Sequence, residues 1–440
     1  MRALGICLGV WLAAALPVLA AEPWTLERAL EYALTNSPDA QLARARMAAA
    51  RAGLDQANSA VWPRLQFQSS YLRTDNPMQV FGSILNQQAY SPALDFNDVP
   101  DMDNVNVKGL ATLPLYTGGK IRASREAARA QTEAAWFESD AVRNALGFEV
   151  ARAFYTVLKT REFVRAAEAS VFSFESALAT ARKRLEGGEL LKSELLDIEV
   201  RLAQAREELV RARNANTLAG RALRNLLGIE SGAFEVADTA PGVSAPRTED
   251  VSLRPELEAA RQRERAAEEQ MRAARAGHLP RVSAFGSLDY DHGWRTDSGA
   301  GSYTAGALVQ WDLWDGHLTR AKVREAAAHL EMAREERRKI RLALGFEAEQ
   351  ARLDLQTAAE RLRVSEAAVA QAAESASLTR ARFDQGLALA TQLIDAETAL
   401  LAAKVRRAEA EADQRIATAA LRKALGLPQL DPKPTGISRP

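Results

Sequence analysis

The side chains most often used for catalysis or metal binding are few in this chain and lie far apart. Its only cysteine is Cys7, and its four histidines are His278, His292, His317 and His329. No histidine has a partner at the spacing of a metal site or a catalytic triad, and Gly299-Ala300-Gly301 lacks the strand-to-helix context of a phosphate loop. A single cysteine excludes disulfide scaffolds and iron–sulfur clusters. The inventory therefore predicts a protein that is not an enzyme and holds no metal or other cofactor.

The overall charge argues against a second class of function. The chain has 440 residues, with 57 Lys and Arg against 57 Asp and Glu, so its net charge is zero. This balance removes the bulk positive charge on which a nucleic-acid-binding protein relies. Hydrophobic residues make up 47%, much of it alanine, and aromatic residues only 6%. That composition favours long, exposed helices over a thick aromatic core.

Residues 1–20 have the pattern of a secretory signal peptide. Arg2 precedes an apolar run from Ala3 to Leu19, and Val18-Leu19-Ala20 predicts cleavage after Ala20. A membrane anchor is the alternative, although the run is short for one. No other segment approaches the roughly 18 consecutive apolar residues of a spanning helix, so any passage through a bilayer has to use strands.

The sequence contains an internal repeat. Residues 182–188 return as 380–386 and residues 195–199 return as 393–397, both at an offset of 198. Upstream, Pro63 matches Pro280 at an offset of 217, so the first copy holds 19 additional residues. These fall between Asp75 and Asp103, a stretch rich in Asn, Asp, Gln and Pro that predicts a long surface loop. Each copy predicts a helix, a strand, a loop, a strand, a long helix, a tight turn and a helix.

The helical segments predict long, closely packed hairpins. Residues 121–185 and 318–383 contain no proline, and apolar residues from Val164 to Leu185 recur in steps of three and four, which indicates a heptad seam. Shorter helices are expected at 39–62 and 193–227. Together they nearly match the long helix in length, so two short helices should lie beside one long helix in each copy.

Four segments alternate like β-strands: 64–72, 104–116, 281–290 and 302–314. Their lengths match tilted membrane-spanning strands, although a hairpin on a soluble core gives the same alternation. Four strands leave two open edges, so we expect strands from three chains to close a twelve-stranded barrel. Aromatic residues at the strand ends are expected at the membrane interfaces: Tyr71, Tyr116, Tyr290, Tyr303, Trp311 and Trp314.

Taken together, the chain resembles the TolC family of outer-membrane efflux channels. The resemblance rests on the segment from Trp24 to Pro38, the strand exits Leu115-Tyr116-Thr117-Gly118-Gly119 and Leu313-Trp314-Asp315-Gly316, both Arg-x-Arg-hydrophobic-x-x-Gly turns, and the helix ends at Leu227-Gly228 and Leu425-Gly426. It covers the chain from Thr25 to Leu427. It implies a mainly α-helical, two-repeat protomer and a homotrimer, with a twelve-stranded β-barrel in the outer membrane of a Gram-negative bacterium and a long α-helical barrel across the periplasm. The implied function is a channel for efflux or type I secretion, which receives substrates from an inner-membrane pump through a periplasmic adaptor protein.

The expected organisation follows from the repeat and the resemblance. After the signal peptide, residues 21–228 form the first repeat, with a strand hairpin at 64–116 and a helical hairpin at 119–227. Residues 229–254 form a connector, and residues 255–427 form the second repeat, with hairpins at 281–314 and 318–425. Residues 428–440 are expected to be a flexible tail.

The resemblance also implies two sets of site residues. The turns at the far end of the tunnel meet the adaptor, which here points to Arg184, Leu185, Gly187, Gly188, Arg382, Phe383 and Gly386. Glycines at these positions are also ordinary helix caps. A negative constriction at the tunnel entrance maps to Gln392 and Asp395, and in the first copy to Glu194 and Asp197.

This sequence departs from the family pattern at two of those places. Gln392 is not acidic, and the arginine that latches the closed state in the best-known member falls at Ala388. Three Asp395 side chains around a threefold axis would still select cations, whereas an Asp in the first turn of a helix also simply complements the helix dipole. The rival function is a secreted periplasmic coiled-coil scaffold, or the adaptor itself, without a membrane barrel.

Overall fold

The structure is a computed structural model that describes residues 23–95, 97–231, 234–238, 244–246, 250–252 and 254–430. The expected signal peptide, part of the expected connector and the end of the expected tail lie outside these residues. The helices are α1 (Leu26–Asn36), α2 (Pro38–Ser59), α3 (Pro77–Asn86), α4 (Lys120–Glu186), α5 (Lys192–Leu227), α6 (Pro255–Arg275), α7 (Leu318–Asp384) and α8 (Ala390–Ala424). A short 3₁₀ helix covers Ala276–His278, and the strands are β1 (Arg64–Thr74), β2 (Met102–Tyr116), β3 (Arg281–Gly293) and β4 (Ser298–Gln310).

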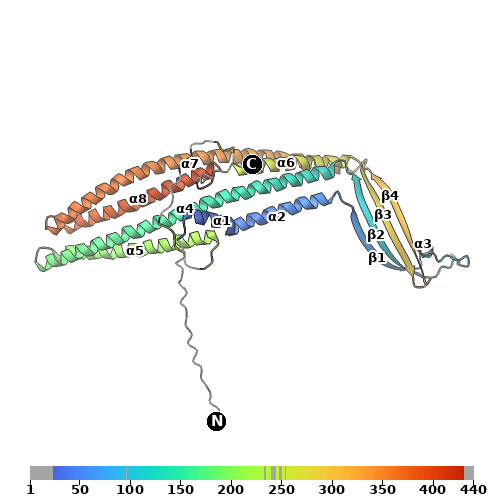
Figure 1. Cartoon of the computed structure of the whole chain (residues 1–440), viewed down its shortest axis with the longest axis horizontal. Helices are drawn as coiled ribbons and strands as arrows, with labels where there is room; N and C mark the ends of the chain where they lie inside the picture. Colours follow the sequence, from blue (N-terminus) through green and yellow to red (C-terminus); the bar gives the residue numbers. More distant parts are fainter. Residues whose placement is uncertain are drawn as a thin grey trace, which may run out of the picture.

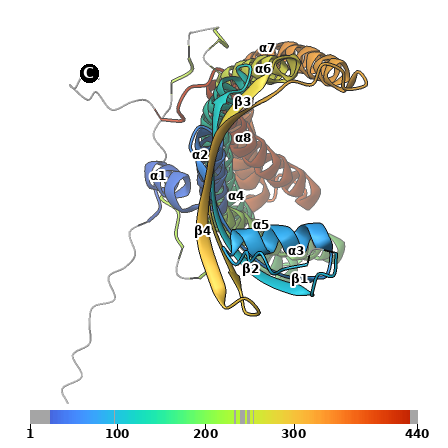
Figure 2. The same cartoon turned by 90° about the vertical axis from the view of Figure 1, so that its right-hand side faces the viewer.

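The molecule is a long helical body with a sheet at one end (Figure 1). The two long helices, α4 and α7, have 67 residues each, which corresponds to about 100 Å at 1.5 Å per residue. Helices α2 and α5 lie along α4, and α6 and α8 lie along α7. The predicted arrangement of two short helices beside each long one is confirmed. Viewed end-on, the chain traces an open arc (Figure 2).

The segment before the first strand contains the helix expected at 39–62, as α2, and one further helix, α1, that the sequence analysis did not predict. It forms two helices, because Ser37 has an extended backbone and its hydroxyl accepts a hydrogen bond from the amide of Ala40 at 3.2 Å, while Pro38 takes the first position of α2. Helix α2 then ends at Ser59, and turns with i to i+3 hydrogen bonds follow as far as Trp62, directly before Pro63.

The expected surface loop between Asp75 and Asp103 contains a helix. Asn76 caps α3 by accepting from the amide of Met78 at 3.1 Å, and Pro77 occupies the first helical position. Val80 and Ile84 on one face of α3 pack with Met102 of β2. Helix α3 lies on the concave side of the sheet, at its far end (Figure 2).

The sheet is antiparallel, in the order β1-β2-β3-β4, so β1 and β4 form its two edges. Strand β4 runs from Ser298 to Gln310 rather than from 302 to 314, and Trp311 and Trp314 lie beyond it. The reason is the partner strand. Arg281, the first residue of β3, pairs with Gln310, and the preceding Pro280 has no amide hydrogen to continue the ladder.

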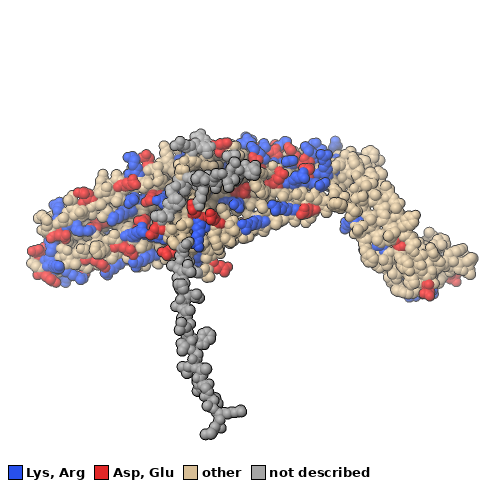
Figure 3. Space-filling view, in the orientation of Figure 1, with Lys and Arg blue, Asp and Glu red and all other residues tan. Residues whose placement is uncertain are grey.

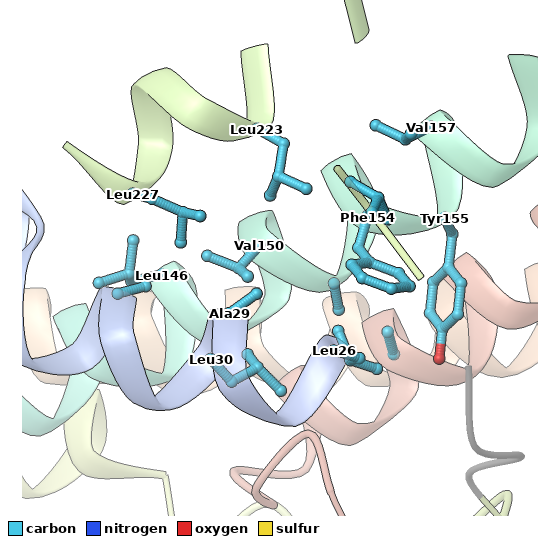
Figure 4. Packing of buried hydrophobic residues seen from close by; sticks show 14 of the residues in the cluster. Leu26, Ala29, Leu30, Leu146, Val150, Phe154, Tyr155, Val157, Leu223 and Leu227 are labelled. Atoms are coloured by element: carbon cyan, nitrogen blue, oxygen red, sulfur yellow. The ribbon is translucent and has the colours of Figure 1, made fainter. Parts of the chain in front are cut away.

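The largest buried cluster lies at mid-length of the helices, where α1 and the connector meet the long helix (Figure 4). Leu26, Ala29, Leu30 and Ala33 form the buried stripe of α1, at the spacing of one helical face. They pack around Phe154 of α4 and the end of α5. The connector is held there by a parallel bridge, in which Trp24 donates to the carbonyl of Glu235 at 2.7 Å.

Charged side chains are spread along the helical body, whereas the visible face of the sheet has few of them until its far end (Figure 3). Among the described residues, no helix is both long enough and apolar enough to span a membrane.

Candidate functional site

Each long helix ends in the same tight turn. Gly188 and Gly386 both have a φ of 76°, the left-handed region that favours glycine. Glu189 then donates its amide to the carbonyl of Arg184 at 2.8 Å, and Leu387 donates to that of Arg382 at 2.7 Å. This is the Schellman arrangement that ends many helices. These two glycines are therefore required by the backbone, whatever else the turns contact.

Arg184 joins the two turns. Its Nη1 donates to the carbonyl of Phe383 at 3.0 Å, and its guanidinium lies over the Phe383 ring at 5.1 Å from the centroid. Its Nε is buried without a hydrogen-bond partner, and Glu189 Oε2 lies 4.0 Å away. Arg184 thus ties the first repeat to the second within one chain, a contact between residues that are 199 positions apart.

The turns enclose a shared apolar core. Phe383 is fully buried, together with Phe174, Leu178 and Ala181 of α4 and Ile198 of α5, and Leu185 packs partly buried against them. The predicted heptad seam of α4 is confirmed by this packing. Among the residues expected to meet an adaptor, Phe383 therefore supports the turn from inside, whereas Gly187, Gly188, Arg382 and Gly386 are exposed.

The four residues expected to form a constriction take two different positions. The carboxylate of Glu194 accepts hydrogen bonds from the amides of Leu191 and Ala390, both at 3.3 Å, so it caps the start of α5 and of α8 at once. Gln392 accepts from the amide of Leu389 at 3.3 Å and caps α8 alone. Asp197 and Asp395 are exposed, and no hydrogen bond or ion pair of the described residues includes either. The structure thus commits the first pair to helix caps and leaves the second pair facing solvent.

Sequence reasoning missed a buried polar cluster just above the turns. Glu397 of α8 is buried, accepts a hydrogen bond from Ser173 of α4 at 2.9 Å, and forms an ion pair with Arg380 of α7. The repeat-equivalent pair, Arg182 and Glu199, is exposed, with 3.1 Å between Arg182 Nη2 and Glu199 Oε1. The sequence contains both Arg–Glu pairs at the offset of 198, but it does not show that Ser173 covers only one of them.

A second feature that sequence reasoning missed is an apolar rim on the turns. Leu191, Leu387 and Leu389 are each more than half exposed. They precede the first residues of α5 and α8, where a side chain has no helical neighbours on its outer side. Large exposed apolar side chains gathered at one place indicate an interaction surface.

The two faces of the sheet have opposite chemistry. The register places Leu65, Phe67, Leu288, Tyr303 and Val309 on one face, and all are exposed. On the other face Lys108 pairs with Asp289 at 3.3 Å, and Asn104 and Asn106 donate to Asp291 at 2.6 and 3.1 Å. An exposed apolar face opposite a hydrogen-bonded polar face is typical of strands that separate lipid from water.

The six expected interfacial aromatic residues are all exposed. Tyr71, Tyr290 and Tyr303 lie within strands, whereas Trp311 and Trp314 follow β4 at the helical end of the sheet. Tyr116 ends β2 beside a β-bulge, which brings it opposite Val282. Their placement at a lipid interface stays a prediction. Within the described ranges, no three His, Cys, Asp or Glu side chains are grouped to hold a metal ion.

The amphipathic sheet and paired helical hairpins define a class of outer-membrane channel, and the family comparison agrees. The model of the outer membrane efflux protein family matches residues 29–229 and 251–427, so the chain belongs to that family. The expectations of an outer-membrane channel that is not an enzyme are thereby confirmed. No curated protein matches the chain significantly.

Several solved structures share the fold. The outer membrane protein VceC from Vibrio cholerae has a TM-score of 0.76 at 22% identity, with 91% of this chain and 96% of that chain covered. The Campylobacter jejuni CmeC outer membrane channel has a TM-score of 0.79 at 16% identity, with 92% and 87% covered. The Neisseria gonorrhoeae MtrE outer membrane channel, solved in its open state, has a TM-score of 0.76 at 17% identity, with 92% of this chain and 89% of that chain covered.

Proposed function

We propose that three copies of this chain form one efflux channel, in which twelve strands close a barrel in the outer membrane and the helices form a tunnel through the periplasm. One observation carries the proposal: a four-stranded sheet with an exposed apolar face whose edge strands, β1 and β4, each have one partner among the described strands. Unpaired edge groups are not tolerated in hydrocarbon, so each edge needs a strand from another chain. The family assignment supports the channel over a periplasmic scaffold.

The turns are proposed as the end that meets a periplasmic adaptor, which joins the channel to an inner-membrane pump. The exposed part of this end includes Gly187, Gly188, Arg382 and Gly386 and the apolar rim of Leu191, Leu387 and Leu389. Apolar anchors surrounded by charged residues are a common composition of protein interfaces. Arg184, Leu185 and Phe383 would act by holding these residues in place.

The constriction is proposed to consist of Asp197 and Asp395, which the repeat places at equivalent positions, six residues after Leu191 and Leu389 of the apolar rim. In three copies they give six carboxylates at one level of the tunnel. Carboxylate rings attract cations and select by charge. Glu194 and Gln392 lie in the turn before and support this ring as caps.

The experiment is to purify the mature protein from outer membranes in detergent, measure its native mass and then reconstitute it in a planar bilayer. A trimer that gives discrete single-channel currents is the expected result. The rival scaffold predicts that the protein leaves the membrane during a carbonate wash and gives no currents, and that outcome would overturn the proposal.

A further inference from the structure

The basic residues of this chain are not spread evenly, although its net charge is zero. The two segments that lead from the sheet into the long helices, residues 117–125 and 316–324, contain six Lys or Arg and no Asp or Glu. The next residue of each segment is an acid, Glu126 or Glu325, so the excess is confined to the helix starts. At the other end of the sheet, residues 95–103 contain four Asp and no Lys or Arg. The sheet therefore lies between a basic end and an acidic end.

Most of these basic side chains have no acid beside them. We call the following six residues the basic collar: Arg64 at the start of β1, Lys120 and Arg122 of α4, and Arg320, Lys322 and Arg324 of α7. All six are exposed, and no ion pair of the described residues includes any of them. The acids that precede α7 are already engaged, because Asp312 pairs with Arg281 at 3.2 Å and Asp315 accepts from the amide of Thr319 at 2.8 Å. The collar thus keeps its positive charge.

The stability of the helices does not explain these charges. Neither α4 nor α7 has an acidic residue in its first turn. The start of a helix carries a partial positive charge, so Lys and Arg at this position oppose the helix dipole. An anion beside the collar would offset both the side-chain charges and the dipole.

The collar adjoins the surface that faces lipid in the proposed channel. Figure 3 shows Lys and Arg gathered at the end of the helical body next to the sheet, on the same face as the part of the sheet that has few charges. This is the convex side of the chain, since the arc opens toward the opposite side in Figure 2. Leu313 and Trp314, which lie between β4 and α7, are 78% and 75% exposed. Apolar strand residues, then tryptophan, then basic residues is the order that matches hydrocarbon, interface and headgroups in one lipid leaflet.

We propose that the basic collar binds the phosphate groups of anionic phospholipids, such as phosphatidylglycerol, in the leaflet that faces the periplasm. The inference rests on the barrel of the proposed function and adds the class of lipid that meets its periplasmic edge. The ligand is a lipid rather than a free anion, because its acyl chains would lie on the exposed apolar face that begins beside the collar. Basic residues beside an anionic membrane surface attract its headgroups over a short range, so the collar would fix the depth at which the barrel sits.

Helix α7 supplies a matched control for the test. Its Lys-x-Arg sequence at Lys322 and Arg324 occurs again at Lys339 and Arg341, about 26 Å further from the sheet. All four side chains are exposed, and no ion pair of the described residues includes any of them. The two sites therefore differ in their distance from the membrane and not in their chemistry.

The experiment compares Lys322→Gln/Arg324→Gln with the control Lys339→Gln/Arg341→Gln. Each channel is purified in a neutral detergent and titrated with phosphatidylglycerol, and the bound lipid is counted by native mass spectrometry. We expect the first variant to bind the lipid about thirtyfold more weakly than the parent, and the control to bind it as the parent does. Lys322→Arg/Arg324→Lys keeps both charges and should also bind as the parent does.

Two further probes identify the ligand. Phosphatidylcholine with the same acyl chains has no net charge and should bind more weakly than phosphatidylglycerol. Inorganic phosphate at the same concentration should not displace the bound lipid. Equal binding of the two lipids, or displacement by phosphate, would overturn the assignment to an anionic phospholipid.

Native mass and channel currents separate this inference from the proposed function. If Lys322→Gln/Arg324→Gln is a conducting trimer that binds phosphatidylglycerol as tightly as the parent, the collar does not hold lipid and the channel stands. If its ion selectivity changes while lipid binding does not, the collar lines the tunnel, which also overturns the inference. If the parent itself is a monomer without currents, the barrel fails and the collar with it.

Discussion

Arg184 and Phe383 are joined across the two repeats, because Nη1 of Arg184 donates to the carbonyl oxygen of Phe383 at 3.0 Å. A hydrogen bond from a charged donor contributes about 2 kcal/mol, so Arg184→Ala should make both turns open more easily. We expect the amides of Glu189 and Leu387 to exchange with solvent about thirtyfold faster, as measured by hydrogen–deuterium exchange.

The control for this prediction is Arg182→Ala, which lies two residues before Arg184 in the same helix. Arg182 is exposed and pairs with Glu199, an interaction of small net stability. Its removal should leave the exchange of both amides unchanged. Equal acceleration in the two variants would show that Arg184 has no special part in the turns.

Gly188→Ala should destabilise the first turn. The φ of 76° places an alanine in a strained region at a cost of about 1–2 kcal/mol, and a Cβ there would contact nothing within 4 Å, so the cost is that of the backbone. Gly187→Ala is the matched control, because Gly187 has a φ of −78°. Thermal unfolding followed by circular dichroism should show a lower midpoint for the first variant alone.

Glu397→Ala should destabilise the protein by about 2 kcal/mol, because it removes a buried acceptor from Ser173 and Arg380. Arg380 is partly exposed, and water offsets some of the loss. The equivalent Glu199→Ala, in an exposed pair, should change stability by less than about 0.5 kcal/mol. Chemical unfolding of both variants measures the difference, and equal losses would mean that burial of the cluster is of no consequence.

Asp395→Ala should change conduction without changing assembly. Asp395 is exposed, and in three copies its negative charge would concentrate cations at the constriction. We expect a lower single-channel conductance for cations and weaker block by multivalent cations in planar bilayers, with an unchanged native mass. Unaltered conductance and block would remove Asp395 from the constriction.

The start of α6 should be sensitive to acid. Burial raises the pKa of the Glu256 carboxyl, but hydrogen bonds and the charge of Arg254 outweigh it and hold that pKa below its ordinary value of 4.5. A lowered carboxyl pKa contributes stability that is present above the ordinary pKa and is lost as the pH falls through the lowered one. Below about pH 4.5, Glu256→Gln should therefore lose less thermal stability than the parent protein does. The control is Glu258→Gln, two residues further along α6. Identical stability-versus-pH profiles of the parent and Glu256→Gln would contradict the prediction.

The extended features of the fold were predictable from the sequence, because they depend on local repetition. The long helices, the heptad seam of α4 and the lengths that pair short with long helices all follow from periodicity and from the absence of proline. The end of β4 was misplaced because alternation continues to Leu313, whereas the ladder ends where its partner strand begins at Arg281. Helix α3 was missed because the composition of its segment concealed the Asn76-Pro77 start signal.

For the turns at the end of the long helices, the sequence predicted the backbone conformation but not the side-chain contacts. Gly188 and Gly386 follow from the need for a left-handed residue after a helix, which the sequence shows directly. The bridging role of Arg184 and the double cap made by Glu194 depend on which turn lies beside which, and that relationship comes from packing between repeats.

The equal lengths of α4 and α7 have a mechanical consequence. In a closed ring of three chains, the six long helices of 67 residues would all begin at the sheet and end at the same level, so the end of the tunnel would be flat. A ring-shaped partner could then contact all six helix ends at once. Inserting one heptad into α4 alone would place the helix ends at two alternating levels. The same insertion in both α4 and α7 would lengthen the tunnel and keep all the ends at one level.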